Sequence, residues 1–430
     1  MKPVLQVALD FLNSHRAMQI AKETIDGGAD WLEAGTPLIK SEGIEIVRIL
    51  RETFPQQTIV ADLKTMDTGA LETEMAAKAG ADIVCVMAAS DDSTIKEAVA
   101  SAHKYGTKIM VDLLGVKNKI KRSQQLEKMG VHYLCLHIGI DEQMKGKKPV
   151  DYLQTLIQNT TLPVAVAGGI TADTASTIVE TGAAIVIVGG AITKAKNVTK
   201  ATKTIIDAIQ GKTIEKNDYH LRYHQKDLHL AFSKVSTPNI SDAMHRKGAM
   251  KHILPLKPGY HMVGKALTVE TIDGDWAKPV EAIDQAEPGT VLVINAHGGQ
   301  TAIWGELATR SAKQKGLAGI VVDGAVRDID DICTQDLPVF CRFTAPNAGD
   351  PKGFGEIGAE IICGEQNVQS GDWIIGDDSG VVVVPQGKAQ EIANRALDVK
   401  EQENRIREEI NQGQGLGTVL DLKKWEKKNK

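Results

Sequence analysis

Residues Ile59–Gly69 read IVADLKTMDTG, a stretch that starts as a buried strand and ends in charged residues. Asp62 and Lys64 are two positions apart, so both side chains point to the same side of an extended strand. Asp67 follows in what we expect to be a loop. An apolar strand that ends in charged residues indicates a fold in which the catalytic side chains lie at the ends of buried strands.

The surrounding sequence alternates between short apolar runs and segments of helical periodicity up to about Gly211. The apolar runs are Val4–Leu9, Trp31–Ala34, Thr58–Leu63, Asp82–Met87, Lys108–Leu113, His132–His137, Pro163–Ala167 and Ala184–Val188. Because strands of an all-parallel sheet read as continuous apolar runs, this pattern predicts a (β/α)8 TIM barrel over residues 1–211. A doubly wound sheet is the alternative, but units of such even length favour closure.

The pattern changes after a polar stretch without apolar periodicity, which predicts a linker over residues 212–226. Residues 227–430 alternate less regularly and predict a second, separate α/β domain. Its strand candidates are Val263–Ile272, Thr290–Asn295, Ala318–Val322 and Val381–Pro385. We expect a long charged helix from about Gly387 to Ile410, followed by a solvated basic tail over Lys423–Lys430.

Composition excludes several classes of protein. The 430 residues are too many for one ordinary core, which agrees with two domains. A net charge of -5 gives no reason to expect nucleic acid or an anionic membrane as partner. No apolar run approaches the roughly 20 residues of a membrane span. The five scattered cysteines without CxxC spacing, and an N-terminus unlike a signal peptide, predict a cytoplasmic protein with reduced thiols.

Charged residues gather where the predicted barrel strands end, and the active site of a barrel lies at those ends. The residues expected there are Asp10, Glu33, Asp62, Lys64, Asp112 and His137. Gly168-Gly169 and Gly189-Gly190 follow the last two strands, where backbone N–H groups suit a phosphate. A single Asp at a strand end is usually a helix cap. Lys64, however, needs a partner inside a barrel, and Asp62 lies on the same face.

These residue types predict a particular chemistry. Glu33 and Asp62 offer the oxygen ligands that Mg2+ prefers. The Lys64 ammonium would stabilise an enediolate oxygen as charge develops, and His137 is placed to move protons.

The run Asp62–Asp67 resembles the DxKxxD element of the orotidine-monophosphate decarboxylase superfamily. More specifically, the first half of the chain is similar to 3-hexulose-6-phosphate synthases over almost its whole length. The matching stretches are QVALD (6–10), EAGTP (33–37), KAGAD (78–82), AVAGGI (165–170) and VGGAI (188–192).

This resemblance implies a Mg2+-dependent aldol reaction that joins formaldehyde to the phosphosugar ribulose 5-phosphate, and the reverse reaction. It makes Glu33 and Asp62 metal ligands, Lys64 the enediolate stabiliser and His137 a proton-handling residue. It also implies a homodimer in which Asp67 reaches into the partner subunit's site.

A sister family, 3-keto-L-gulonate-6-phosphate decarboxylase, is the alternative. That family typically carries Glu, Arg, Thr and Arg at four positions that are Asp112, Ile140, Ala167 and Ala191 in this chain. All four residues follow the synthase pattern, so we favour the aldolase.

A second group of candidates lies in Asn295–Glu306 (NAHGGQTAIWGE), which follows an apolar strand and is expected to open a helix, as anion-binding loops do. Another predicted strand ends before Arg327 and Asp328. Structural roles are the alternative. The glycines could form a tight turn, and Asp328 could cap the following helix and pair with Arg327.

These elements resemble the family of class II 4-hydroxy-4-methyl-2-oxoglutarate aldolases and ribonuclease-activity regulator-like proteins, from about Leu228 to Gly387. Their most specific part is Glu306, then twenty residues, then Arg327-Asp328. The resemblance implies Mg2+ or Mn2+ on Asp328, with Glu306 acting through water. It assigns the pyruvyl group of a 2-oxo acid to Arg327 and a carboxylate to the backbone of Gly298-Gly299-Gln300. The alternative is a regulatory or oligomerisation domain without activity.

Overall fold

The computed structural model describes residues 3–145, 149–214, 222–420 and 422. The chain forms two compact units: residues before Arg222 together with those from Glu401 onward, and Arg222–Lys400. Residues 215–221 of the predicted linker and the predicted tail Lys423–Lys430 lie outside the described residues. Among the helices described, none has both the length and the apolar character that crossing a membrane requires.

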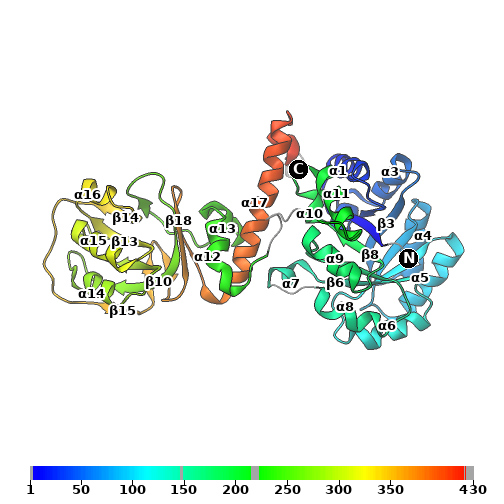
Figure 1. Cartoon of the computed structure of the whole chain (residues 1–430), viewed down its shortest axis with the longest axis horizontal. Coiled ribbons are helices and arrows are strands. Elements are labelled where there is room, and N and C mark those ends of the chain that lie inside the picture. Colours follow the sequence, from blue (N-terminus) through cyan, green and yellow to red (C-terminus); the bar gives the residue numbers. More distant parts are fainter. Residues whose placement is uncertain (1–2, 146–148, 215–221, 421, 423–430) are drawn as a thin grey trace, which may run out of the picture. The chain divides into compact units, whose positions relative to one another are not determined.

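In the first unit, eight parallel strands close into a barrel in the order β1 to β8 (Figure 1). The strands are β1 (Val4–Leu9), β2 (Trp31–Ala34), β3 (Thr58–Thr65), β4 (Ile83–Met87), β5 (Lys108–Asp112), β6 (Tyr133–His137), β7 (Val164–Ala167) and β8 (Ile185–Val188). Pairing of Val4 with Ile185 and of Val7 with Val188 closes the ring. The predicted (β/α)8 barrel is confirmed.

The barrel is surrounded by helices that connect its strands. They are α1 (Ser14–Asp26), α2 (Thr36–Glu42), α3 (Glu45–Thr53), α4 (Gly69–Lys78), α5 (Asp92–Tyr105), α6 (Lys119–Lys128), α7 (Ile140–Met144), α8 (Val150–Ile157), α9 (Ala172–Glu180), α10 (Gly190–Thr193) and α11 (Val198–Ile209). Alternate residues of each strand divide between two cores, because successive side chains point to opposite faces. Leu5, Val7 and Leu9 pack toward the helices, whereas Ala8 lies inside the barrel with Cys85 and Cys135.

The second unit is built on a sheet of nine strands, with the main order β19-β18-β10-β11-β13-β14-β9. Its strands are β9 (Leu254–Pro255), β10 (Met262–Glu270), β11 (Thr290–Asn295), β12 (Ala302–Trp304), β13 (Gly319–Val326), β14 (Val339–Thr344), β15 (Glu356–Ile357), β18 (Trp373–Asp377) and β19 (Gly380–Val384). A separate hairpin pairs β16 (Ile361–Cys363) with β17 (Gln366–Val368). The helical segments are η1 (Gln225–Asp227), α12 (Leu228–Ser233), α13 (Thr237–Ala243), α14 (Ala277–Gln285), α15 (Glu306–Lys315), α16 (Ile329–Cys333) and η2 (Gln386–Lys388).

Strands β10, β11, β13 and β14 run parallel at the centre of this sheet. Both faces of the sheet are buried: Leu292 and Ile294 contact one core, and Val291 and Val293 contact another. The prediction of a second, separate α/β domain is confirmed.

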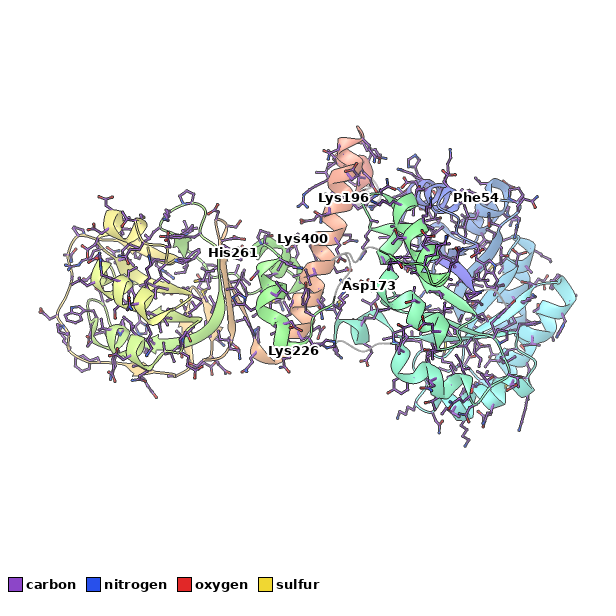
Figure 2. The ribbon with its side chains drawn as sticks, viewed as in Figure 1. Phe54, Asp173, Lys196, Lys226, His261 and Lys400 are labelled. Carbon is purple, nitrogen blue, oxygen red and sulfur yellow. The ribbon has the colours of Figure 1, made fainter. Side chains whose placement is uncertain are left out.

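The long helix expected near the end of the chain is α17 (Ala389–Asn411), followed by α18 (Leu416–Val419). Lys400 of this helix, labelled in Figure 2, donates to the Lys234 carbonyl within the second unit. From Glu401 onward, however, the chain belongs to the first unit. The prediction assigned this whole segment to the second domain and is corrected here. The physical reason is a set of buried ion pairs made by Arg405 and Glu409 with residues of the first unit.

Close packing of α4 on α5 generates a test of the barrel. A Cβ atom added at Gly69 would lie 2.1 Å from the carbonyl oxygen of Thr94, a backbone atom inside helix α5. We expect Gly69→Ala to lower the free energy of unfolding of the first unit by about 1–3 kcal/mol, because the helices must separate. Denaturant unfolding measures the change. Gly387→Ala is the control, since no atom lies within 4 Å of its added Cβ. Equal losses in both variants would contradict the packing argument.

Candidate active site

Three carboxylates meet at the mouth of the barrel. Asp10 directly follows β1, Glu33 lies on β2 and Asp62 lies on β3, and the last two are buried. The Asp62 Oδ2 atom accepts hydrogen bonds from Thr36 Oγ1 at 2.8 Å and from Lys64 Nζ at 2.7 Å. The structure therefore brings together residues from the first three strands, as predicted from the strand ends.

The crowding of these carboxylates changes their protonation. Burial, and then the charges of Asp62 and Asp10, raise the pKa of Glu33 well above its ordinary value, against a hydrogen bond from Gln6. Asp10 keeps contact with solvent, yet desolvation of its carboxyl and the charge of Asp62 raise its pKa as well. Negative charge gathered in this way is a site that a cation would stabilise.

Lys64 connects the carboxylates to β5, two strands further around the barrel. Its Nζ atom lies 3.5 Å from Asp112 Oδ2, in addition to its contact with Asp62. Burial acts to lower the pKa of Lys64, but the charges of Asp62 and Asp112 outweigh burial and hold that pKa above its ordinary value. The residue adopts a left-handed backbone conformation with φ 49°, at the point where the strand ends.

His137 completes this network from β6. Its Nδ1 atom lies 2.8 Å from Asp112 Oδ2. Burial acts to raise the pKa of Asp112, but the hydrogen bond and charge of His137 and the charge of Lys64 hold it below its ordinary value. Asp112 is thus an ionised carboxylate that orients both Lys64 and His137, and it contacts the imidazole through Nδ1 and not through Nε2.

Asp67 lies apart from the network within its own chain. It is exposed, and its Oδ1 atom accepts a hydrogen bond from the Thr68 N–H at 2.7 Å. Two large apolar side chains nearby are also exposed, Met66 by 53% and Leu71 by 64%. The role of Asp67 in a partner subunit stays a prediction.

The four glycines expected to bind phosphate lie at the ends of β7 and β8. Gly168 has φ 108°, and a Cβ atom there would lie 2.3 Å from the Ile138 carbonyl oxygen, so this position requires glycine. The N–H groups of Gly168, Gly169 and Gly189 donate to no other residue in the described part of the chain. Their binding of phosphate stays a prediction.

Four further residues line this site. Gln6 donates to Glu33, Thr36 donates to Asp62, Gln143 lies over Gly169, and Lys194 lies beside Gly190. The sequence could have identified Gln6. It lies two positions before Ala8 on the same strand, so its side chain points to the same face, into the barrel. Gln143 and Lys194 come from short connecting helices that carry no periodic signal.

The predicted metal ligands form a pair. Among the described residues, no three His, Cys, Asp or Glu side chains are grouped so as to hold a metal ion. Glu33 and Asp62 nevertheless fit Mg2+, which is commonly bound by one or two carboxylates and several waters. Burial is the largest cause of the raised pKa of Glu33, and the charges of Asp62 and Asp10 come after it; a bound cation would offset these two charges.

In the second unit, the structure brings Glu306, Arg327 and Asp328 together. Asp328 Oδ2 accepts a hydrogen bond from the Glu306 N–H at 3.2 Å and lies 3.4 Å from Arg327 Nε. The Glu306 carboxylate pairs with Arg310 at 2.6 Å. Asp328 precedes α16 in a left-handed conformation, but its side chain makes no cap hydrogen bond to that helix. Its pairing with Arg327 is therefore present, whereas its capping role is not.

The glycine loop differs in part from its prediction. The stretch Asn295–Glu306 follows β11 and ends at the first residue of α15, as predicted, but strand β12 lies between its glycines and the helix. The N–H of Gly298 donates to the Asp323 carbonyl at 3.1 Å, and that of Gly299 donates to the Ala296 carbonyl at 2.9 Å. These bonds compete with the predicted carboxylate, because both amides are already used. Binding by Gln300 stays a prediction.

Two further charge pairs border this loop. Arg342 Nε lies 2.6 Å from Asp323 Oδ1, and His297 Nε2 lies 2.7 Å from Glu270 Oε1. A Cβ atom at Gly298 would lie 3.5 Å from an Arg342 nitrogen, so a second arginine stands beside the loop. Sequence reasoning missed these pairs, because each pair becomes visible only when neighbouring segments of the sheet are aligned: β13 with β14 for Asp323 and Arg342, and β10 with the loop after β11 for Glu270 and His297.

Comparisons with known proteins agree with this division. Residues 3–205 match the orotidine 5′-phosphate decarboxylase / HUMPS family, and residues 237–383 match the RraA-like Aldolase/RraA family. The chain belongs to the first family through its barrel, and its second unit contains an RraA-like domain. Both resemblances are confirmed, and the expectation of a lyase is supported.

Within the first family, the similar proteins include 3-hexulose-6-phosphate synthases. That of Staphylococcus epidermidis is 41% identical over 211 residues, which are 48% of this chain and 99% of that protein. That of Bacillus subtilis is 43% identical over 193 residues, which are 44% of this chain and 91% of that protein.

Solved structures match each unit separately. A crystal structure of a 3-hexulose-6-phosphate synthase is 37% identical and covers 48% of this chain and 99% of its own, with a TM-score of 0.46. The structure of Streptomyces coelicolor RraAS2, described as an unusual member of the RNase ES inhibitor RraA family, is 30% identical. It covers 42% of this chain and 96% of its own, with a TM-score of 0.40.

The ionised state of Asp112 predicts a pH dependence of stability. Its pKa is lower in the folded than in the unfolded protein, so it stabilises the fold above its unfolded pKa of about 3.9. That contribution is lost as pH falls through the lowered pKa. We expect wild type to be more stable than Asp112→Asn at pH 7, and the difference to shrink below about pH 4. Urea unfolding at several pH values measures it. A difference that does not change with pH would contradict this assignment.

Proposed function

We propose that the barrel is a 3-hexulose-6-phosphate synthase. It would catalyse the aldol condensation of formaldehyde with D-ribulose 5-phosphate to D-arabino-hex-3-ulose 6-phosphate, and the reverse. The observation that carries the proposal is the Asp62–Lys64–Asp112–His137 network beside Glu33 and Asp10. Support also comes from the curated relatives of that name.

Each residue of the network has a task in this reaction. The imidazole of His137 accepts the proton that leaves C1 of ribulose 5-phosphate, while Asp112 fixes its orientation through Nδ1. The electron pair forms an enediolate, which the Lys64 ammonium stabilises. The nucleophilic C1 then forms a bond to formaldehyde, and the resulting alkoxide takes up a proton.

Glu33 and Asp62 would hold a divalent cation, and Mg2+ is the proposed one. When bound, such a cation supplies electrostatic stabilisation of the substrate oxygens near C1 and C2. Thr36 keeps Asp62 in place for this task through its 2.8 Å hydrogen bond. Gln6 does the same for Glu33.

The phosphate end of the substrate would lie over the glycines that follow β7 and β8. A backbone free of side chains allows close approach and offers N–H donors. Lys194 supports this placement, because its side chain lies within 3.9 Å of the position of a Cβ atom on Gly190. Asp67 would act in the site of a second copy of the chain, which makes a homodimer of barrels the proposed assembly.

A decarboxylase of 3-keto-L-gulonate 6-phosphate is the competing function for the barrel. Ala167 and Ala191 offer no hydroxyl or cationic group to a decarboxylation intermediate, and Ile140 is an exposed apolar residue at the start of α7. These positions favour the aldol reaction.

The first test compares the two reactions. We expect formaldehyde consumption that depends on ribulose 5-phosphate, and a fall of kcat by roughly a hundredfold or more in Asp62→Asn, because the lost carboxylate anchors Lys64. Asp91→Asn, an exposed carboxylate of the same barrel mouth, is the control and should keep full activity. The assignment fails if CO2 is released from 3-keto-L-gulonate 6-phosphate with a higher kcat/KM than that of the aldol reaction.

For the second unit we propose metal-dependent cleavage of a 2-oxo acid. Asp328 would hold Mg2+ or Mn2+ with help from Glu306, and Arg327 would bind the pyruvyl carboxylate through its planar fork. The contact between Asp328 and the Glu306 N–H supports this set, since it fixes both residues at one place. The competing function is a regulatory or oligomerisation role without catalysis.

The second test uses the full chain with its barrel site disabled by Asp62→Asn. We expect pyruvate release from 4-hydroxy-4-methyl-2-oxoglutarate or oxaloacetate with Mg2+ or Mn2+, and a loss of roughly a hundredfold or more on adding Asp328→Ala. Asp330→Ala is the control, because this exposed carboxylate lies two residues away. Absence of turnover, or turnover that Asp328→Ala leaves unchanged, would favour the regulatory role.

A further inference from the structure

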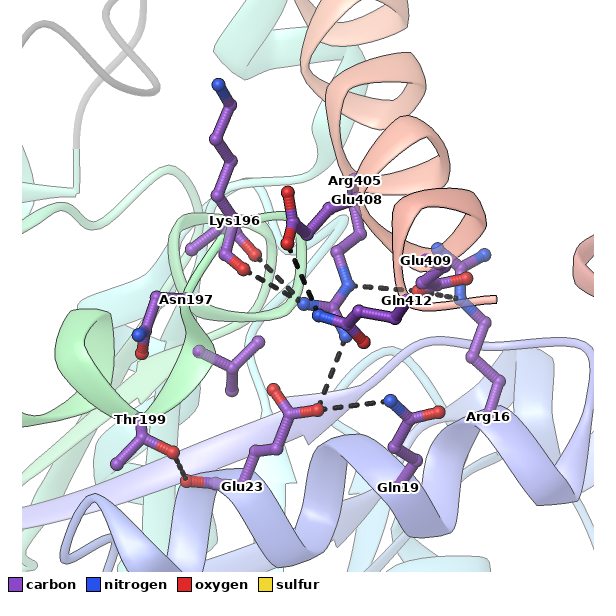
Figure 3. A network of polar contacts seen from close by, with 12 residues as sticks. Arg16, Gln19, Glu23, Lys196, Asn197, Thr199, Arg405, Glu408, Glu409 and Gln412 are labelled. Atoms are coloured by element: carbon purple, nitrogen blue, oxygen red, sulfur yellow. Dashed lines mark hydrogen bonds and ion pairs between the residues drawn. The ribbon is translucent and has the colours of Figure 1, made fainter. Parts of the chain in front are cut away.

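One arginine of α17 is almost completely buried in the first unit. The side chain of Arg405 is 1% exposed, and every edge of its guanidinium is used (Figure 3). Its Nε atom donates to Glu409 at 2.9 Å, and Nη2 lies 3.4 Å from Glu23. Its Nη1 atom donates to the carbonyl oxygens of Ala195 at 3.4 Å and Lys196 at 3.3 Å.

The buried charges are balanced. Arg16 lies 3.1 Å from Glu409, which is itself 1% exposed, so two arginines face Glu409 and Glu23. Burying a charge is costly unless it is paired and hydrogen-bonded. Helix docking alone needs no such group, since apolar residues of similar volume hold helices together at least as well. A single guanidinium nitrogen, Nη1, lies within reach of two successive backbone carbonyls, which indicates that a particular chain conformation is being fixed.

The carbonyls that Arg405 binds belong to the segment Lys194–Asn197, between α10 and α11. At the end of this segment, Asn197 caps α11 by accepting the Lys200 N–H at 2.8 Å. At its start, the Lys194 side chain lies beside Gly190 at the mouth of the barrel. A Cβ atom on Gly189 would lie 3.8 Å from Asp10 Oδ2, so this backbone borders the carboxylates of the site.

We infer that Arg405 is a positioning residue for the sugar-phosphate end of the barrel site. By fixing the segment Lys194–Asn197 through two carbonyls, it sets the position of Lys194 and of the Gly189-Gly190 backbone. The inference rests on the proposed synthase function and extends it: a residue outside the family match of residues 3–205 helps to build the site. The segment that follows Lys400 thereby contributes to the site of a barrel that β1 to β8 already close.

Steady-state kinetics of the full chain test the inference. We expect Arg405→Ala to raise KM for ribulose 5-phosphate by roughly tenfold and to change kcat and KM for formaldehyde by less than about twofold, because the phosphate end alone loses its support. Arg405→Lys keeps the charge without the planar fork and should give a smaller rise. Arg407→Ala is the control, since Arg407 is 58% exposed and pairs with Glu403 on the same helix.

Hydrogen exchange provides a readout that does not depend on activity. The amides of residues 189–197 should exchange faster in Arg405→Ala than in wild type and Arg407→Ala, while those of β3 and β5 stay unchanged. Unchanged exchange at 189–197, or an equal rise in KM for both substrates, overturns the inference. If Arg405→Ala unfolds, the same two measurements are made on Arg405→Lys and decide in the same way. If wild type lacks synthase activity, the proposed function fails, and the exchange pattern still decides whether Arg405 fixes this segment.

Discussion

The barrel site depends on one charge, the Lys64 ammonium between Asp62 and Asp112. Carboxylates as crowded as Asp10, Glu33 and Asp62 repel one another, and burial favours their neutral forms. Lys64 offsets part of this repulsion and connects β3 to β5, and Asp112 carries the connection on to His137 in β6. The same contacts that offset the buried charges therefore hold His137 at a fixed place relative to the Lys64 ammonium. Removing any member would change the protonation of the others, so the network acts as a unit.

Features that depend on the local sequence could be predicted, whereas those that depend on residues distant in the chain could not. Strands β1 and β2 coincide with the predicted runs Val4–Leu9 and Trp31–Ala34, because a strand buried on both faces is apolar throughout and local composition suffices. The charged residues at the strand ends could also be assigned to one site. The strands run parallel, so their ends meet at one mouth of the barrel, and side chains that alternate along a strand reach its inner face at every second position. In the second unit, β14 was missed because Arg342 interrupts its apolar pattern. Its charge is matched by Asp323 on the neighbouring strand, and such a partner is visible only after the strands are paired.

The end of the chain shows a different limit. Helix α17 is rich in charged residues, a composition that predicts a solvated surface helix. Arg405 and Glu409 are nevertheless among its buried residues, because their partners Arg16 and Glu23 come from α1, nearly four hundred positions earlier in the chain. Periodicity can show that a helix is amphipathic, but it cannot show that two opposite charges on one face will be buried together. For this reason the chain has a second domain boundary, inside a continuous helix after Lys400, in addition to the one at the linker.

The two sites are built with unequal rigidity, and this difference bears on their chemistry. Lys64, Asp62 and Asp112 are held by strands of a closed barrel, so the barrel site is preorganised before any ligand arrives. Arg327 and Asp328 lie after the end of β13, and both side chains are partly exposed with a separation of 3.4 Å. A pair of that kind contributes little to stability. It is free to exchange its partner for a ligand, since an arginine fork binds a carboxylate and an aspartate binds a cation in the same place. The weak pairing within the chain is thus the physical basis for expecting a ligand at the second site.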